Sequence, residues 1–328
     1  MTRALITGVT GQDGSYLAEL LVASGREVVG MARDPAAPAP NLANVDVELV
    51  AGDLRDRDGL RRLVADVAPD ELFHLAAPTF VPASWEDPAA TFEEIAGATA
   101  TLLSAAAGTQ IRVFVASSSE IFGDAGESPQ REESPMRPWS PYGVAKLAAH
   151  RLVGAYRRGG LHASSGITFN HESPRRPERF LPRKVTRAAA AIALGLEREL
   201  PLGSLDAVRD WSAARDVVRG MVLAVEHEEP GDYVLASGIG RTVRELVHTA
   251  FAHVGLDPAD HVRVDPAFVR PPEATPPVGD PSRARAVLGW EPEISFEELI
   301  GEMVDADLAD LSARGGSGGP ATGRPRRT

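Results

Sequence analysis

The chain has 328 residues, a net charge of −12 and no cysteine. The acidic excess argues against a nucleic-acid-binding protein, because such proteins present basic surfaces to phosphates. The absence of cysteine excludes disulfides, thiolate catalysis and Cys-ligated metals, and no metal site is expected.

The amino-terminal residues lead directly into a strand-like run and lack the apolar core of a signal peptide. No apolar run approaches the ~20 residues that a membrane-spanning helix needs. The sequence therefore predicts a cytoplasmic protein that does not enter a membrane.

The first half of the chain alternates short apolar runs with helical patterns. Strands are expected at Ala4–Thr7, Glu27–Met31, Val45–Val50, Glu71–Leu75 and Arg112–Ala116. Helices are expected near Ser15–Ala23, Asp58–Val67 and Pro88–Ala107. This alternation predicts an α/β fold with a parallel, doubly wound sheet. The proline-rich segment Asp34–Asn41 predicts a loop, either a surface linker or part of an interface.

The second half is less regular and predicts a smaller mixed α/β lobe that binds substrate. Helices are expected at Tyr142–Arg157, Lys184–Gly195, Ala213–His227 and Thr242–His253. A further helix is expected from the Asp280-Pro281 cap to Gly289. Residues 1–165 are expected to form a domain that binds a dinucleotide and carries the catalytic groups. Residues 166–312 are expected to form most of the substrate lobe, with some segments returning to the first domain. Residues 313–328 are expected to form a disordered tail.

A glycine-rich loop follows the first strand and opens the first helix. Glycines in this position permit a tight turn and let a pyrophosphate approach the helix amino terminus. The context therefore predicts a Rossmann-type site for a nicotinamide dinucleotide, formed by Gly8, Gly11, Gln12, Asp13 and Gly14.

The end of the second strand bears on the choice between NAD and NADP. NAD sites usually place an acid there, whereas this chain has Ala32 followed by Arg33, which suits a 2′-phosphate. Asp34 weakens this preference, so NAD stays open. Asp53 and Leu54 are expected to flank the adenine. The small residues of the segment Leu75, Ala76 and Ala77 are expected to let the cofactor pass.

Tyr142 and Lys146 are four residues apart and would share one helix face. A nearby ammonium and a cationic nicotinamide favour the phenolate, so Tyr142 is expected to act as a base near neutral pH. Ser118 and Glu120 follow the fifth strand and would point the same way in an extended segment. Ser118 would hydrogen-bond a sugar hydroxyl. Glu120 could remove a proton alpha to a ketone, or could be only a cap or surface acid.

With these features the sequence resembles the GDP-mannose 4,6-dehydratases of the short-chain dehydrogenase/reductase superfamily, over nearly everything up to Leu311. The most specific segments are TGVTGQDGSYLAELL from Thr7, ASSSEIFG from Ala116, SPYGVAKLAAHR from Ser140 and GITFNHESPRR from Gly166.

The resemblance implies a hydro-lyase that carries tightly bound, recycled NADP. Tyr142 would deprotonate the C4 hydroxyl of GDP-mannose, and Glu120 would take the C5 proton and assist loss of water from C6. The hydride taken from C4 would return to C6 and give GDP-4-keto-6-deoxymannose. The implied cofactor residues also include Tyr142, Lys146, His171 and Arg176. The implied substrate residues are Ser119, Glu120, Asn170, Leu181, Lys184, Arg209, Arg270 and Glu273.

Some positions depart from the family pattern. Pro78-Thr79 replaces the usual Gln-Ser, Pro177 replaces a glycine, and Ser204, Val208 and Ala213 replace the usual Asn, Lys and His. The segment Arg33–Pro38 replaces the Arg-Arg-Ser-Ser-Ser stretch that reaches a neighbouring subunit's cofactor. A homodimer built from two helices per subunit is therefore expected in place of a tetramer.

Two alternatives remain at this point. A GDP-sugar 4-reductase or epimerase on the same scaffold would not need Glu120 beside Ser118. A non-catalytic NADP-binding regulatory protein would not need the catalytic residues.

Overall fold

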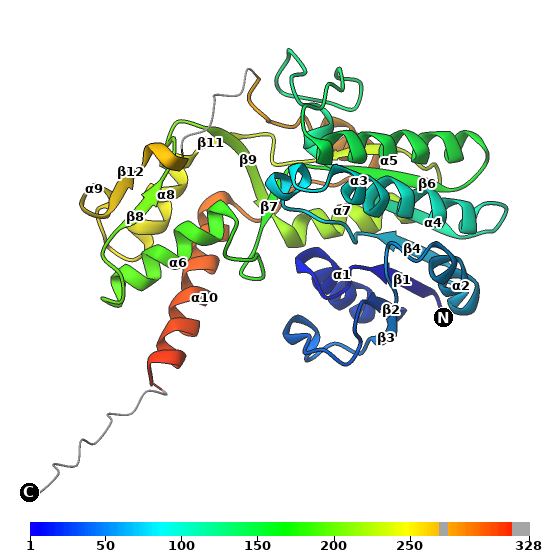
Figure 1. Cartoon of the computed structure of the whole chain (residues 1–328), viewed down its shortest axis with the longest axis horizontal. Helices are drawn as coiled ribbons and strands as arrows, with labels where there is room; N and C mark the ends of the chain where they lie inside the picture. The colour runs from blue at the N-terminus through cyan, green and yellow to red at the C-terminus, as the bar shows by residue number, and fades with distance from the viewer. Residues whose placement is uncertain (269–274, 317–328) are drawn as a thin grey trace, which may run out of the picture.

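A computed structural model of the chain describes residues 1–268 and 275–316. Its centre is a seven-stranded parallel sheet with the order β10-β6-β5-β4-β1-β2-β3 (Figure 1). The strands are β1 (Arg3–Thr7), β2 (Glu27–Ala32), β3 (Glu48–Ala51), β4 (Glu71–His74), β5 (Arg112–Ala116), β6 (Ala163–Thr168) and β10 (Asp232–Leu235). The order reverses beside β1, which opens a crevice at the carboxyl ends of the strands.

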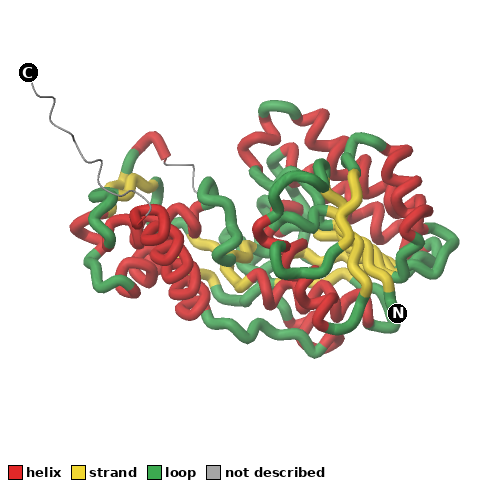
Figure 2. Tube along the Cα trace, turned by 90° about the horizontal axis from the view of Figure 1, so that it is seen from below, coloured by secondary structure: helices red, strands yellow, loops and turns green. Residues whose placement is uncertain are grey.

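Helices cover both faces of this sheet (Figure 2). On one face, Leu17 and Met221 pack with Phe114 in one buried cluster. On the other face, Leu60 and Leu102 belong to a second cluster. The helices are α1 (Gln12–Ala23), α2 (Arg57–Val67), α3 (Pro88–Phe92), α4 (Ala98–Ala106), α5 (Pro141–Arg158) and α7 (Ala214–Glu226). The predicted doubly wound α/β fold is confirmed.

The described part of the second lobe contains the helices α6 (Leu181–Ala193), α8 (Val243–His253), α9 (Pro258–His261) and α10 (Phe296–Gly316). Helices α6, α8 and α10 pack around a separate core that includes Trp211 and Phe251, and the short helix α9 lies outside it. A two-stranded sheet joins β8 (Leu200–Leu202) and β12 (Val262–Val264). A three-stranded mixed sheet joins β11 (Gly240–Thr242), β9 (Val208–Ala213) and β7 (Asn170–Glu172). Figure 1 places β7 and β9 between the two lobes.

Short helical turns complete the fold. The 3-10 turns are η1 (Pro40–Leu42), η2 (Val81–Trp85), η4 (Ser119–Ile121) and η5 (Pro266–Phe268). The π-helical turns are η3 (Glu93–Gly97), which joins α3 to α4, and η6 (Ala284–Leu288). The helix predicted after Asp280 is present: the Asp280 carboxylate accepts the Ser282 amide at 3.0 Å, and Gly289 ends η6 with a left-handed φ of 64°.

Within the central sheet, three strands differ from the sequence predictions. Strand β3 begins at Glu48, three residues late, because Val45 and Val47 pack against the core outside the sheet. Strands β6 and β10 were not predicted. Strand β6 reads Ala-Ser-Ser-Gly-Ile-Thr, and all six residues are buried despite their small or polar side chains. It crosses the predicted division at residue 165, while β10 and α7 return from the later segment to the first domain.

Helix α10 is fastened to α6 by a buried ion pair. Asp307 is fully buried, and Arg183 donates to its two oxygens through Nε at 2.8 and 3.0 Å. The hydroxyl of Thr186 adds a hydrogen bond at 2.8 Å. Helix α10 continues to Gly316, so the first residues of the predicted disordered tail are helical. Residues 317–328 lie outside the described part of the chain.

Across residues 1–268 and 275–316, no helix combines the length and apolarity needed to cross a membrane.

Candidate active site

The glycine loop connects β1 to α1 at the crevice. Gly8 has a φ of 78°, and a Cβ there would lie 2.9 Å from the backbone nitrogen of Ala76. A Cβ on Gly14 would lie 2.2 Å from the Gly8 carbonyl oxygen. Gly11 precedes α1 without a side-chain cap, so the first amides of the helix are left for a ligand. This bare, tightly turned loop fits the pyrophosphate of a dinucleotide.

A polar pair that sequence reasoning missed joins the ends of β1 and β4. The Thr7 hydroxyl oxygen accepts the amides of Leu75 and Ala76 at 3.2 Å each and lies 2.8 Å from His74 Nδ1. Because both lone pairs of this oxygen are used, its proton must go to Nδ1, so His74 is the neutral Nε2–H tautomer. The available clue was polar residues at the ends of two otherwise apolar strands.

Burial, with a smaller contribution from the charge of Lys146, lowers the pKa of His74 to about 3. As the pH falls through about 6.5, His74 therefore binds a proton in the unfolded chain but not in the folded chain. The contribution of His74 to the free energy of unfolding is thus present above pH 6.5 and is lost as the pH falls. Between pH 8 and pH 5 we expect a loss of about 2 kcal/mol in the free energy of unfolding from His74 alone. Urea unfolding of the wild type and of His74→Asn at both pH values measures this loss in the free energy of unfolding.

The variant keeps an acceptor near Thr7 but cannot titrate, so its stability should fall less. His248, exposed on α8, supplies the control His248→Asn, which should follow the wild type. Equal acid sensitivity in wild type and His74→Asn would contradict the assignment.

The loop is tied to β7 by a second polar group. Asp13 Oδ2 lies 2.9 Å from His171 Nε2, and His171 Nδ1 lies 2.7 Å from the Phe169 carbonyl. Both partners are acceptors, so the imidazole carries a proton on each nitrogen. Burial alone would lower the pKa of His171, but Asp13 outweighs it and raises the pKa. Gln12 extends the tie by donating to the His171 carbonyl at 3.1 Å.

Tyr142 and Lys146 lie one turn apart on the buried face of α5. Ser140 caps the helix, and its hydroxyl accepts the Gly143 amide at 3.0 Å. Tyr142 hydrogen-bonds Ser118, which follows β5. Lys146 Nζ donates to the Ala116 carbonyl at 2.7 Å and lies 5.8 Å from the centre of the Tyr142 ring. The structure thus brings together three of the four predicted catalytic side chains.

In the protein without a cofactor, the surroundings of Tyr142 favour the neutral phenol. Burial raises its pKa to about 12, and the charge of Glu120 adds to this, against the lowering effects of the Ser118 hydrogen bond and Arg176. Burial also lowers the pKa of Lys146 to about 8. Without a cofactor the phenol is therefore neutral near pH 7, because desolvation exceeds the stabilisation from nearby cations. The phenolate expected with a cationic nicotinamide beside Tyr142 stays a prediction.

Glu120 lies in a helical turn and not in the extended segment that was expected. Residues Ser119–Ile121 form η4, so Ser118 and Glu120 do not alternate along an extended strand. The Ser118 hydroxyl caps this turn and accepts the Glu120 amide at 3.3 Å. The turn packs against α5, where a Cβ on Gly143 would lie 2.6 Å from the Glu120 carbonyl. Its carboxylate is close enough to act on the pKa of Tyr142.

The segment after β4 continues towards Tyr142. Ala77 packs against the apolar cluster that contains Tyr142. A cavity of about 180 Å³ lies beside the tyrosine and is lined in part by Pro78 and Phe80. Pro78, one of the departures from the family pattern, therefore lines the same cavity as Tyr142.

Residues expected at the adenosine end lie around β2 and β3. Arg33 is exposed directly after β2. Asp53 accepts the Arg55 amide at 2.8 Å, and this bond, with the charges of Arg55 and Arg33, lowers the pKa of Asp53. Leu54 packs against the core beneath. The predicted loop Asp34–Asn41 returns to the site, since Asn41 donates to the Thr10 carbonyl at 3.4 Å.

The residues expected to hold the substrate are less closely grouped. Asn170 pairs with Trp211, two residues after Arg209, across β7 and β9. Arg209 Nη1 donates to the Val208 carbonyl at 2.6 Å. Lys184, on α6, donates to the Pro201 carbonyl at 2.7 Å and lies over the Phe268 ring.

Two other expected substrate residues lie in different elements. Ser119 belongs to η4, and Leu181 begins α6. Arg270 and Glu273 lie outside the described residues. The predicted diphosphate clamp stays a prediction.

A doubly wound sheet, a bare glycine loop and a buried Tyr-x-x-x-Lys pair beside a serine define a short-chain dehydrogenase/reductase. A family model described as GDP-mannose 4,6 dehydratase matches residues 5–303. The chain belongs to this family.

Curated relatives and solved structures agree with this. The chain is 42% identical over 323 residues to GDP-mannose 4,6 dehydratase 1 of Arabidopsis thaliana, covering 93% of this chain and 89% of the relative. It is 43% identical to GDP-mannose 4,6-dehydratase of Sinorhizobium fredii, with 94% and 97% covered. The structure of RMD from Pseudomonas aeruginosa complexed with NADPH superposes with a TM-score of 0.79 at 26% identity, covering 94% of this chain and all of that one (100%).

Proposed function

We propose that this chain dehydrates GDP-mannose to GDP-4-keto-6-deoxymannose with a recycled nicotinamide cofactor. The observation that carries the proposal is the convergence of Ser118, Glu120 and Tyr142 beside the glycine loop. A reductase or an epimerase needs the hydroxyl and the phenol but has no use for a carboxylate here. The names of the family and of its relatives supply the sugar nucleotide.

Each side chain has one task in this mechanism. Tyr142 removes the proton of the C4 hydroxyl, and Ser118 hydrogen-bonds that oxygen and the phenol. Glu120 takes the proton from C5, which the C4 ketone has made acidic, and returns a proton to the departing C6 hydroxyl. A nicotinamide held at the glycine loop would supply the exchange of hydride between C4 and C6, and the proton that Tyr142 took from the C4 hydroxyl would go to C5. One water is lost and there is no net oxidation.

We assign the cofactor as NADP. Support comes from Arg33, exposed beside Asp53 at the end of β2, where a 2′-phosphate would find a guanidinium. The NADPH complex of the Pseudomonas structure agrees with this assignment. Residues 1–165, with β6, α7 and β10, would form the cofactor domain, and the remainder up to residue 312 the GDP-sugar lobe. Heat release of the nucleotide from purified protein, followed by chromatography, should yield NADP and not NAD.

Incubation of the purified protein with GDP-mannose and no added cofactor tests the function. A dehydratase should form a 4-keto product, detected by its absorbance in alkali, without net accumulation of NADPH. A reductase or epimerase would form no such product, and a non-catalytic binding protein would leave GDP-mannose unchanged. Parallel incubations with GDP-glucose and with UDP- and TDP-sugars test the sugar nucleotide. Reaction of only a non-guanosine sugar would refute the substrate assignment.

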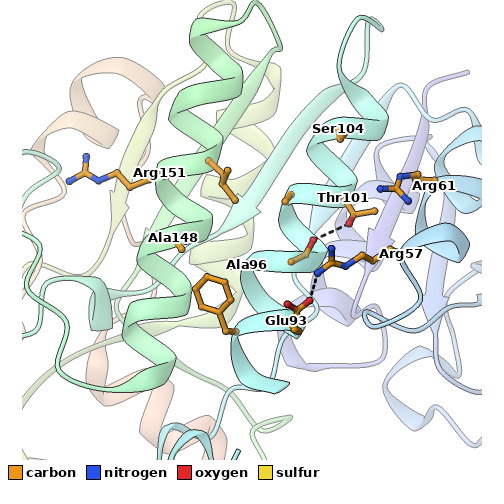
Figure 3. A pocket seen from close by; sticks show the side chains of 12 residues that line it. Arg57, Arg61, Glu93, Ala96, Thr101, Ser104, Ala148 and Arg151 are labelled. Carbon is orange, nitrogen blue, oxygen red and sulfur yellow. Dashed lines mark hydrogen bonds and ion pairs between the residues drawn. The ribbon is translucent and has the colours of Figure 1, made fainter. Parts of the chain in front are cut away.

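We also propose a homodimer through the outer face of α4 and α5. A groove of about 660 Å³ runs between these helices, with Arg57 and Arg61 reaching it from α2 and Ala148 and Arg151 on the α5 side (Figure 3). Large apolar side chains lie exposed on the neighbouring elements: Trp85, Phe92, Trp139 and Val144. Two helices from each of two subunits would cover this surface.

Ala148→Arg should separate the dimer, because a guanidinium placed on the floor of the groove would be buried without a partner. Sedimentation velocity should show a monomer in place of a dimer. Ala252→Arg, exposed on α8 in the other lobe, is the matched control and should leave the mass unchanged. An unchanged mass for Ala148→Arg would rule out this face.

A further inference from the structure

Two adjacent arginines follow β7, and their surroundings differ. Arg175 Nη1 donates to the Ser15 hydroxyl at 2.9 Å and Nη2 forms an ion pair with Glu19. Its guanidinium also lies 3.8 Å from the centre of the Tyr16 ring. All three partners belong to α1. Arg175 is therefore fully engaged in fastening the segment after β7 to the first helix.

Arg176 is held from the opposite side. Its Nε lies 3.1 Å from Glu172 Oε2, and its guanidinium carbon lies 3.7 Å from the centre of the Phe180 ring. Its carbonyl accepts Arg183 Nη1 at 3.3 Å. Arg183 also donates to the Pro174 carbonyl. The backbone and the side chain of Arg176 are thus fixed independently.

The held guanidinium lies among the groups of the candidate site. Its charge acts on Asp13 of the glycine loop, on His171 and on Tyr142. Arg176 is therefore near enough to the cofactor loop and the catalytic tyrosine for its charge to act on both, whereas the named contacts of Arg175 all lie on α1.

Glu172 is an unusual residue to find at this position. It is 1% exposed, and neither of its carboxylate oxygens accepts a hydrogen bond from any residue in 1–268 or 275–316. Its ion pair with Arg176 is the close contact that offsets the cost of burial. Burying a carboxylate without hydrogen bonds costs folding free energy, so its presence points to a role in holding its partner in place.

We propose that Glu172 is a positioning residue that fixes the Arg176 guanidinium against Phe180, where it meets the phosphates or ribose of the bound nucleotide. Glu19 plays a different part, because its partner Arg175 only fastens the loop to α1. The inference rests on the proposed function, which assigns Arg176 to the cofactor.

The test measures the dissociation constant of NADPH, by fluorescence, on cofactor-stripped protein. If Glu172 positions Arg176, Glu172→Gln should weaken NADPH binding about tenfold, as expected for loss of a charge-assisted contact. If Glu172 were only a negative charge near an anionic ligand, its removal would tighten binding. Unchanged or tighter binding therefore overturns the proposal.

Two further variants separate positioning from a general structural role. Glu19→Gln should leave the dissociation constant within about twofold and change the thermal midpoint little, since a partly exposed ion pair contributes little to stability. Glu172→Asp keeps the charge and should restore part of the affinity. It also replaces Glu172→Gln if that variant does not fold. Equal weakening by Glu19→Gln and Glu172→Gln would overturn the proposal.

A double-mutant cycle with Arg176→Lys completes the test, because lysine keeps the charge but lacks the planar fork. Arg176→Lys should weaken NADPH binding, and adding Glu172→Gln should then have no further effect. Additive losses, or no loss in Arg176→Lys, would overturn the positioning claim. Product formation from GDP-mannose is scored separately, so loss of product with intact NADPH binding would count against the proposed function alone.

Discussion

Replacing Tyr142 with phenylalanine is expected to reduce kcat by about 10³-fold, the range found when a positioned acid–base group is lost. The phenol hydrogen-bonds Ser118, the residue expected to hold the sugar hydroxyl. Without it the C4 hydroxyl keeps its proton and no hydride leaves. Rapid mixing of cofactor-loaded variant with GDP-mannose should show no absorbance at the wavelength of NADPH, even in a single turnover.

The control for this variant is the integrity of the pocket. Phenylalanine fills the same volume in the cluster around Ile95 and Ala145, so the thermal midpoint should stay close to that of the wild type. Retention of more than a tenth of the wild-type kcat would show that another group removes the proton.

Replacing Glu120 with glutamine should separate the two halves of the reaction. The C4 oxidation needs only Tyr142 and Ser118, so a single turnover should still produce reduced cofactor. Elimination needs a base for the C5 proton, and the amide cannot supply one, so kcat should fall by about 10²- to 10⁴-fold. The expected signature is an absorbance of NADPH that rises and persists, where the wild type shows none at the end of the turnover.

Glu133→Gln is the matched control, because Glu133 is an exposed carboxylate in the segment that follows η4. It should behave as wild type. If Glu120→Gln instead abolishes the absorbance change, as Tyr142→Phe should, the carboxylate acts before hydride transfer and the division of tasks is wrong.

Local patterns were sufficient to predict five of the seven strands of the sheet, the glycine loop and the Tyr142–Lys146 pair. Each depends on interactions within a few residues: apolar periodicity, a tight turn, or one helical repeat. Strand β6 was missed because its apolar content is low, and its burial depends on β5 and β10, which lie far away in sequence.

The features of the site that the sequence did not predict all depend on the three-dimensional fold. The position of Glu120 depends on a 3-10 turn capped by Ser118, which the serine-rich sequence does not distinguish from a continued strand. The raised pKa of Tyr142 depends on total desolvation, which a spacing of four residues does not reveal. The pairs Thr7–His74 and Glu172–Arg176 also require the three-dimensional fold: the first joins two strands, and the second depends on the turn after β7.

Through the buried pair Asp307–Arg183, helix α10 helps to hold the segment after β7 in place beside the crevice. Arg183 spans from the last helix to the carbonyls of Pro174 and Arg176. A chain shortened to end before Asp307 would leave that guanidinium buried without its anion, which typically costs about 3–5 kcal/mol. Trimming this protein is therefore safe only beyond α10, although nothing in that helix is expected to meet the sugar nucleotide.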